Sequence, residues 1–175
     1  MTAGTAMTEF AAEPLHTPRL GLEVLRVGHA EEAAAAFASP ALHEFIGGSP
    51  STAVDLAARY ARLEKGRSDD GTQLWFNWML RERETGLLVG TVQATVEEAH
   101  TSVAWVVGQP FQRRGYATEA AKAIAAWLRA RGLGPIRAFV HPSNDASAAI
   151  AAHLGLTETS TVLDGENLWI DPART

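Results

Sequence analysis

Residues 107–120 have the sequence VGQPFQRRGYATEA, the most informative stretch of the chain. It passes from the end of an apolar run through a loop with two arginines into an alanine-rich segment of helical periodicity. A helix start leaves four backbone N–H groups without intrahelical partners and carries about half a positive charge. Gly115 lets a ligand approach the backbone, and Ala117 keeps the first turn narrow. The stretch therefore predicts a pyrophosphate site at Gln112 to Ala117.

Other phosphate-binding patterns do not fit this loop. It is not a Walker A loop, because six residues separate Gly108 from Gly115 and Tyr116 stands where Lys is required. Residues 112–137 contain six basic side chains and one acidic one, Glu119, for a net charge of +5, which leaves −10 for the rest of a chain whose total is −5. A basic island in an acidic protein indicates one anionic ligand at one place, and a helix with a solvated basic face is the alternative.

The composition is that of a globular protein. The chain has 175 residues, 46% hydrophobic and 20% charged, which supports one domain with a sizeable core. No cysteine is present, so disulfides and thiolate sites are excluded. The net negative charge argues against nucleic acid as a direct partner, and no apolar run is long enough for a membrane span.

We expect a flexible tail at residues 1–16 and a single domain at 17–175. The tail carries Glu9 and Glu13 but no Lys or Arg, and it has no continuous apolar segment. These features are typical of neither a signal nor a transit peptide, so a cytoplasmic location is expected.

Periodicity and turn residues predict the order strand, two helices, three strands, helix, strand, helix and a final strand region. The expected strands are 19–27, 73–83, 87–96, 101–107, 136–140 and one or two within 156–170. The expected helices are 31–38, 52–63, 116–131 and 144–154, and 40–50 is an expected loop. Three consecutive strands with short turns form an antiparallel meander. The predicted class is α+β, with a mixed sheet and helices on its faces.

The stretch at 107–120 resembles the acyl-CoA pyrophosphate loop, Q/R-x-x-G-x-G/A, of the GNAT family of N-acetyltransferases. Residues 141–156, HPSNDASAAIAAHLGL, are similar to that family's next segment, in which an Asn opens a helix. The two motifs stand in the family's order about 30 residues apart, and the resemblance spans 17–170. The motif G-Y-A-T-E-A at residues 115–120 and the pair Asn144 and Ser147 are most similar to the branch that acetylates the N-termini of ribosomal proteins.

The resemblance implies a mostly antiparallel sheet whose middle strands, 103–107 and 136–140, splay apart. The pantetheine arm of acetyl-CoA would pair between them like an extra strand. A backbone N–H near Val106 or Val107 would face the acetyl oxygen, and Asn144 would contact CoA. The loop supplies the other implied contacts: Gln112, Arg113, Arg114, Gly115, Tyr116, Ala117 and Thr118. Transfer would be direct, with a neutral amine attacking the thioester and CoA leaving as a thiolate that needs a proton.

Ser147 is the candidate proton donor, a role that the ribosomal branch implies, and an inert helical serine is the alternative. Many family members carry a Tyr four residues before the Gly of L-G-F, but this chain has Ala151 there. Glu97 and Glu98, at a strand end, are the candidate bases, directly or through water, with a solvated turn as the alternative. Asn144 is also a good helix N-cap, which is compatible with a CoA contact.

Other polar and aromatic residues receive structural expectations. Glu119 suits the helix dipole, so a structural role is expected. Three histidines lack ligand spacing to a carboxylate and are expected at the surface or in packing: His43, His141 and His153. No metal site is predicted. Three tryptophans are expected in the core: Trp75, Trp105 and Trp127. Trp78 and the loop 43–49 are expected to border the acceptor pocket.

The sequence therefore predicts an acetyl-CoA-dependent N-acetyltransferase acting on a primary amine, first of all a protein N-terminus. A small-molecule amine, such as an antibiotic or a polyamine, is the alternative substrate. A non-catalytic acyl-CoA sensor stays open because the family Tyr is replaced by Ala151. A homodimer is left open as well.

Overall fold

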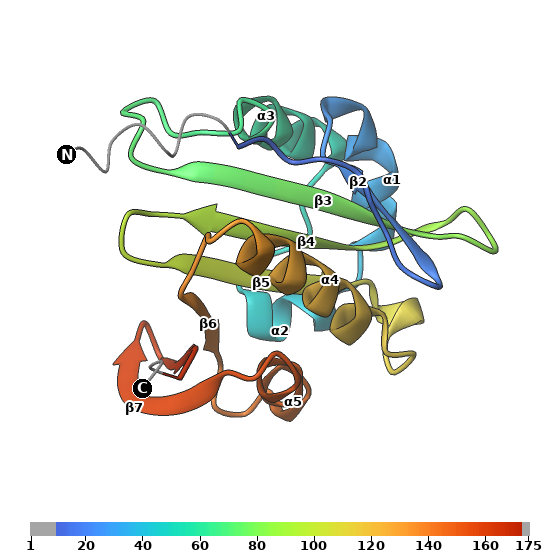
Figure 1. Ribbon diagram of the computed structural model, residues 1–175. Helices are drawn as coiled ribbons and strands as arrows, with labels where there is room; N and C mark the ends of the chain where they lie inside the picture. The colour runs from blue at the N-terminus through green and yellow to red at the C-terminus, as the bar shows by residue number, and fades with distance from the viewer. Residues whose placement is uncertain (1–9, 173–175) are drawn as a thin grey trace.

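The computed structural model describes residues 10–172, which form one eight-stranded sheet in the order β1-β2-β3-β4-β5-β6-β8-β7 (Figure 1). The strands are β1 (Leu15–His16), β2 (Leu20–Val24), β3 (Leu74–Glu82), β4 (Leu88–Val96), β5 (Thr101–Val107), β6 (Ile136–Val140), β7 (Thr157–Leu163) and β8 (Glu166–Ile170). The helices are α1 (Ala30–Ala36), α2 (His43–Ile46), α3 (Ala53–Leu63), α4 (Tyr116–Ala130) and α5 (Asp145–His153). Short 3-10 turns occupy Val27–His29, Pro40–Leu42 and Gln109–Phe111. The predicted class, a mostly antiparallel mixed sheet with helices on its faces, is confirmed.

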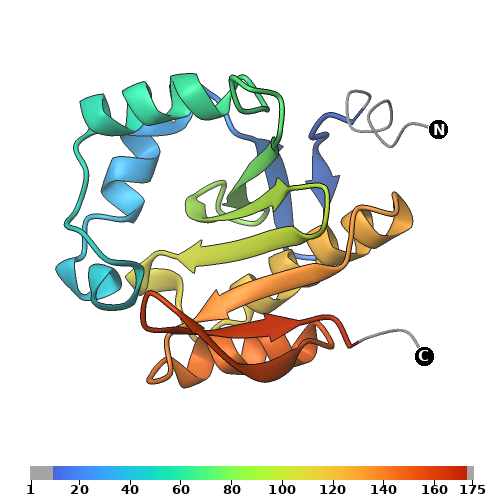
Figure 2. The ribbon, with the colours of Figure 1, turned by 90° about the vertical axis from the view of Figure 1, so that its left-hand side faces the viewer.

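Helices cover both faces of the sheet. Figure 2 shows α1, α2 and α3 on the left of the sheet and α4 on its right. Side chains alternate between the faces, so that Trp78 belongs to a large core cluster with Ile124 of α4, while Met79 packs with Leu56 and Tyr60 of α3. The sheet therefore separates two hydrophobic layers.

β5 and β6 pair only at one end. They are the parallel pair of the sheet, and their register joins Thr101 to Ile136 and Ser102 to Arg137 and stops there. β6 is then held on its other side by antiparallel pairing with β8, and Figure 1 shows it turning away from β5. The implied splay of the two middle strands is confirmed, and the sheet opens from Val103 onward.

Most predicted elements match the structure within a few residues, but the expected loop at 40–50 contains a 3-10 turn and α2. Pro40 starts the turn at a position where its missing N–H costs nothing. Gly47 ends α2 with a φ of 78°, which other residues rarely adopt. The prediction of a plain loop is therefore wrong, and α2 later proves part of the site.

Residues 10–16 were expected in the flexible tail but pack on the domain. β1 pairs with β2, and the indole N–H of Trp78 donates to the backbone carbonyl of Glu13 at 2.8 Å. The indole N–H of Trp127 donates to the Glu13 carboxylate at 2.7 Å. Residues 1–9 of the expected tail lie outside the described residues. Within 10–172, none of the helices has the length and apolar character that crossing a membrane requires.

Candidate active site

The loop between β5 and α4 has the backbone that an anion site needs. Arg113 and Gly115 adopt positive φ values of 63° and 79°. A Cβ at Gly115 would lie 3.3 Å from Nη2 of Arg19, so space and conformation both favour glycine. The first helical bond runs from the Glu119 N–H to the Gly115 carbonyl. The N–H groups of residues 116–118 are therefore left for a ligand.

A groove of about 500 Å³ lies against this loop. Eight of the predicted cofactor contacts line it: Val107, Gln112, Arg113, Gly115, Tyr116, Ala117, Thr118 and Asn144. Arg114 does not, because its guanidinium folds back onto the Pro110 carbonyl and the Phe111 ring. The Tyr116 side chain is buried and its hydroxyl donates to Glu82, a bond that raises the pKa of Tyr116. The Tyr116 phenol is thus tied to the core.

The start of β2 anchors the loop from outside. Arg19 donates from Nη1 to the Arg114 carbonyl and from Nε to the Glu119 carboxylate, both at 2.7 Å. The Thr17 hydroxyl donates to the same carboxylate at 2.6 Å. Burial opposes the charge of Glu119, but the hydrogen bonds from Thr17 and Arg19 outweigh it and hold its pKa below the usual value. The expected structural role of Glu119 is confirmed.

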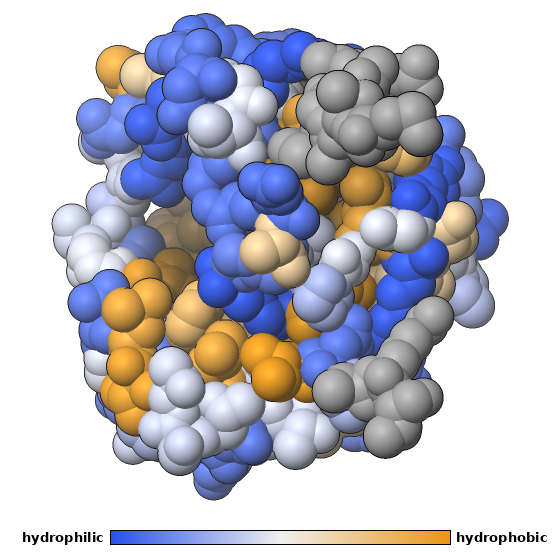
Figure 3. All heavy atoms as spheres, turned by 60° about the vertical axis from the view of Figure 1, so that its left-hand side comes forward, coloured by the Kyte–Doolittle hydropathy of each residue, from blue (hydrophilic) through white to orange (hydrophobic). Residues whose placement is uncertain are grey.

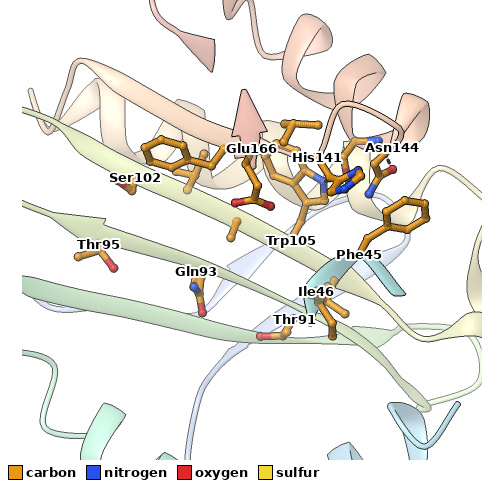
Figure 4. A pocket seen from close by; sticks show the side chains of 16 residues that line it. Phe45, Ile46, Thr91, Gln93, Thr95, Ser102, Trp105, His141, Asn144 and Glu166 are labelled. Carbon is orange, nitrogen blue, oxygen red and sulfur yellow. Dashed lines mark hydrogen bonds between the residues drawn. The ribbon is translucent and has the colours of Figure 1, made fainter. Parts of the chain in front are cut away.

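A second cavity, of about 420 Å³, lies on the other face of the sheet (Figure 4). Val103 and Val107 point into the core under α4, so the β5 residues that alternate with them, Ser102, Ala104 and Val106, point to the opposite face. Alternate residues of the two strands line the cavity on that face: Ser102, Ala104 and Val106 of β5, with Thr91, Gln93 and Thr95 of β4. Figure 3 shows the molecule hollowed beside a hydrophobic patch. We call this space the acceptor cavity.

The groove and the acceptor cavity meet where β5 and β6 diverge. Five residues line both spaces: Phe45, Ile46, Trp105, Asn144 and Ser147. Asn144 caps α5 by accepting the Ser147 N–H at 3.0 Å, which fixes the backbone of Ser147. The indole N–H of Trp105 donates to the Ser147 Oγ at 3.2 Å. Ser147 therefore stands at the passage between the two faces of the sheet.

Some backbone N–H groups of β5 point into the space where β5 and β6 diverge. The Gly108 N–H donates to a β4 carbonyl, whereas the Thr101 N–H donates to the carbonyl just before β6. Because N–H directions alternate along a strand, the Val106 N–H belongs to the β4 ladder and the Val107 N–H points toward β6. Pairing with β6 has ended by then. Val107, and not Val106, therefore offers its N–H to a ligand, while Val106 lines the acceptor cavity.

The structure does not bring Glu97 or Glu98 to either space. Glu97 lies in the β4–β5 turn, where its carboxylate is 3.0 Å from His100 and 3.4 Å from Arg137 and accepts the Gln73 amide at 2.8 Å. Glu98 is exposed in the same turn. The structure thus favours the solvated-turn alternative over the prediction that one of them is the base.

The acceptor cavity has a different carboxylate. Glu166 of β8 is half-buried, and Figure 4 shows it pointing into the cavity. Among the described residues that line this space, Glu166 carries the sole carboxylate, and none is Lys or Arg. The sequence signal for Glu166 was weak, because only the pairing of β8 with β6 brings this residue to the site.

Aromatic side chains and one histidine complete the lining. His141, expected in a surface or packing role, lines the cavity with its ring 5.7 Å from that of Phe45. Its Nδ1 accepts the Ser143 N–H at 3.1 Å, so the neutral ring carries its proton on Nε2. Of the expected loop 43–49, Phe45 and Ile46 line the cavity. Groups of three or more metal-ligating side chains do not occur within residues 10–172.

The predictions for three tryptophans are wrong. Trp105 and Trp75, expected in the core, are half-buried, and Trp105 lines both spaces of the site. Trp78, expected at the acceptor pocket, is fully buried. Trp127 is buried as predicted. The sequence periodicity of β3 and β5 shows which side chains share a face of the sheet, but it does not show which face the helices cover, and the burial of these tryptophans depends on that.

Several solved structures with similar folds are described as acetyltransferases. An acetyltransferase from Agrobacterium tumefaciens is 22% identical, with a TM-score of 0.73 over 94% of this chain and 96% of that one. RimL, described as a ribosomal L7/L12 alpha-N-protein acetyltransferase in complex with coenzyme A, is 13% identical, with a TM-score of 0.72 over 90% and 97% of the chains. The microcin C7 self-immunity acetyltransferase MccE, in complex with acetyl-CoA and AMP, is 16% identical, with a TM-score of 0.67 over 89% and 93%.

At these identities the solved structures establish the fold alone. A search of curated proteins finds no match. A family model described as "Acetyltransferase (GNAT) domain", however, matches residues 19–157, which include the loop between β5 and α4 and all of α5. The match covers most of the sequence, and the chain belongs to the GNAT family of acetyltransferases, enzymes that use acetyl-CoA.

Proposed function

We propose that this protein transfers the acetyl group of acetyl-CoA directly to a primary amine, and that the amine is a protein N-terminus. One observation carries the proposal: Ser147 stands at the passage between an anion-binding groove and a cavity whose described lining holds a carboxylate but no Lys or Arg. An anionic donor and a cationic acceptor fit these two spaces from opposite faces of the sheet.

The groove suits acetyl-CoA, which supplies the activated acetyl group. Free N–H groups at the start of α4 and the Arg113 side chain would hold the pyrophosphate, and glycine at 115 keeps the approach open. The Val107 N–H would stabilise negative charge on the acetyl oxygen. The Ser147 hydroxyl would protonate the departing sulfur.

Glu166 takes the role of base in this proposal. An amine arrives as an ammonium ion and must lose a proton before it attacks, and Glu166 lines the space in which it would bind. An α-amine has a reference pKa of about 7.7–8.0, against about 10.4 for Lys. A protein N-terminus therefore demands less of the base than a lysine side chain does.

Two observations favour a polypeptide acceptor over a small amine. The cavity opens past exposed Phe45 and Ile46, which suits an acceptor that continues beyond the site. The similar fold of RimL supports a protein N-terminus. The similar fold of MccE, a self-immunity enzyme, supports the small-molecule alternative.

The test compares two basic peptides, one with a free N-terminus and no lysine, the other with a blocked N-terminus and free lysines. We expect thiol release from acetyl-CoA with the first peptide and little with the second. The kcat/KM should fall as ionic strength rises, because the rest of the chain carries −10 and salt screens its attraction for a cationic acceptor.

Other outcomes would select among the alternatives. Equal rates for the two peptides would remove the N-terminal assignment. Turnover of a polyamine or an aminoglycoside alone would establish a small-molecule acetyltransferase. Tight binding of acetyl-CoA with no thiol release to any amine would indicate a sensor.

A further inference from the structure

Trp105 is the one aromatic side chain of β5, and it lies where the groove and the acceptor cavity meet. We propose that Trp105 is a positioning residue for acetyl transfer: its indole N–H holds the Ser147 hydroxyl so that the hydroxyl proton is available to the leaving sulfur. The inference rests on the proposed function and adds to it a residue that does not itself exchange a proton.

The direction of the hydrogen bond carries the argument. An indole nitrogen can only donate, so the Ser147 Oγ, 3.2 Å away, must accept. The hydroxyl proton then has to point elsewhere. A helical serine can donate back to the carbonyl three or four residues earlier, but within residues 10–172 the Ser147 hydroxyl donates to no protein acceptor. Its proton is therefore free for a ligand.

Two separate contacts fix Ser147. Asn144 holds the backbone by accepting the Ser147 N–H, and Trp105 holds the side chain. The two partners come from different elements, the N-cap of α5 and the middle of β5. Strand alternation turns the Trp105 ring toward α5, since its neighbours of the same parity, Val103 and Val107, lie in the core on that face. The arrangement leaves Oγ little freedom to rotate away.

The same contact helps the proton leave. During transfer the amine nitrogen bonds to the acetyl carbon, the carbon–sulfur bond breaks and sulfur keeps the bonding pair. Sulfur then takes the proton of the Ser147 hydroxyl, and the serine oxygen recovers a proton from water. Negative charge grows on Oγ during this transfer, and an N–H already aimed at Oγ stabilises that charge. The contribution belongs to kcat and not to the binding of acetyl-CoA.

The experiment removes the N–H of Trp105 and keeps its bulk. Trp105→Phe deletes the donor with a small loss of volume, and a benzothienyl-alanine at position 105 keeps the bicyclic shape with sulfur in place of N–H. The matched control is Trp75→Phe, because Trp75 is also a half-buried strand tryptophan whose N–H donates to a side chain, Gln73, at 2.9 Å outside the site. Ser147→Ala and the double variant Trp105→Phe/Ser147→Ala complete the set.

We expect both replacements at 105 to lower kcat at pH 6.5 by about 3- to 10-fold, the range for one hydrogen bond, with the KM for acetyl-CoA changed less than about 2-fold. The double variant should be no slower than Ser147→Ala, because the two residues act as one unit. The loss should shrink as pH rises toward the thiol pKa of about 8.5, where the sulfur leaves without an acid. Trp75→Phe should match the wild type.

Several results would overturn the proposal. Full activity with benzothienyl-alanine would mean that the ring packs and its N–H does nothing. If the losses in kcat of the two single variants multiply in the double variant, the two residues act independently. An effect confined to the KM for acetyl-CoA would likewise mean that Trp105 does not act through Ser147. If the wild type acetylates an amine and Trp105→Phe is equally active, the positioning role of Trp105 is wrong but the proposed function stands. If the wild type releases no thiol with any amine, the proposed function fails with it.

Discussion

The cofactor groove and the acceptor cavity are built in opposite ways. The anion-binding part of the groove comes from one continuous stretch, residues 112–118, and its donors are backbone N–H groups. The acceptor cavity takes side chains from α2, β4, β5, the end of β6, α5 and β8, from Phe45 to Glu166 along the chain. Changes in the loop should therefore act on acetyl-CoA alone, and changes in the cavity on the amine.

The largest effect should come from Gly115→Glu. This substitution puts a side chain on a backbone with a φ of 79° and places a negative charge at the closest approach of the pyrophosphate. We expect it to abolish acetyl-CoA binding in calorimetry without unfolding the protein.

Gly132→Glu is the matched control for that substitution. Gly132 also has a positive φ, 69°, and lies at the other end of α4, where an added Cβ would meet no atom within 4 Å. It should bear the same strain and charge and keep the affinity for acetyl-CoA. Unchanged affinity in Gly115→Glu would place the pyrophosphate elsewhere.

A smaller effect is expected from Glu166→Gln in the acceptor cavity. Removing a general base typically costs about 100-fold or more in rate, so kcat/KM for the amine should fall by that order while the Kd of acetyl-CoA stays constant. The loss should be greatest below a pH of about 7.7, where an α-amine is still protonated, and should diminish above it.

Glu158→Gln controls for the loss of a charge on the neighbouring strand. Glu158 is exposed on β7 and accepts the Asn167 amide at 2.7 Å, away from the lining of the cavity. It should leave kcat/KM unchanged. A larger loss of kcat/KM in Glu97→Gln or Glu98→Gln than in Glu166→Gln would mean that the general base lies in the β4–β5 turn.

The smallest effect concerns the anchor of the loop. Glu119 has a pKa below the usual value in the folded protein, so its charge contributes stability above the unfolded pKa of about 4.3, and that contribution is lost as pH falls through the folded pKa. Glu119→Gln should therefore lower the Tm at pH 7 by about 3–6 °C and weaken acetyl-CoA binding only a few fold.

The difference in Tm between the wild type and Glu119→Gln should begin to shrink as pH falls below the unfolded pKa of about 4.3, and it should be lost once pH has fallen through the lower folded pKa, where the wild-type carboxyl is protonated too. Glu84→Gln, at an exposed position, should show no such pH-dependent difference. A difference in Tm that does not change with pH at all would mean that the side-chain shape, and not its charge, holds the loop.

Local signals in the sequence were sufficient for most elements. β5, β6, α3 and α4 begin and end within a few residues of the predicted bounds, because alternation, helical periodicity and glycine act over short distances. α2 was missed, since four residues carry too little periodicity to detect. The anchoring of Glu13 by Trp78 and Trp127 was also missed, because those partners are far away in the sequence.

The sequence by itself was sufficient to predict the family, the helix start at Gly115 and the splay that the resemblance implies. A helix start with glycine works through the backbone and needs no distant partner. The tertiary structure alone decided the rest of the site. It put Glu166 into the acceptor cavity in place of Glu97 and Glu98, and it brought Trp105 to Ser147. These contacts depend on the register of β8 against β6 and on the divergence of β6 from β5, and long-range pairing of this kind leaves no local pattern along the chain.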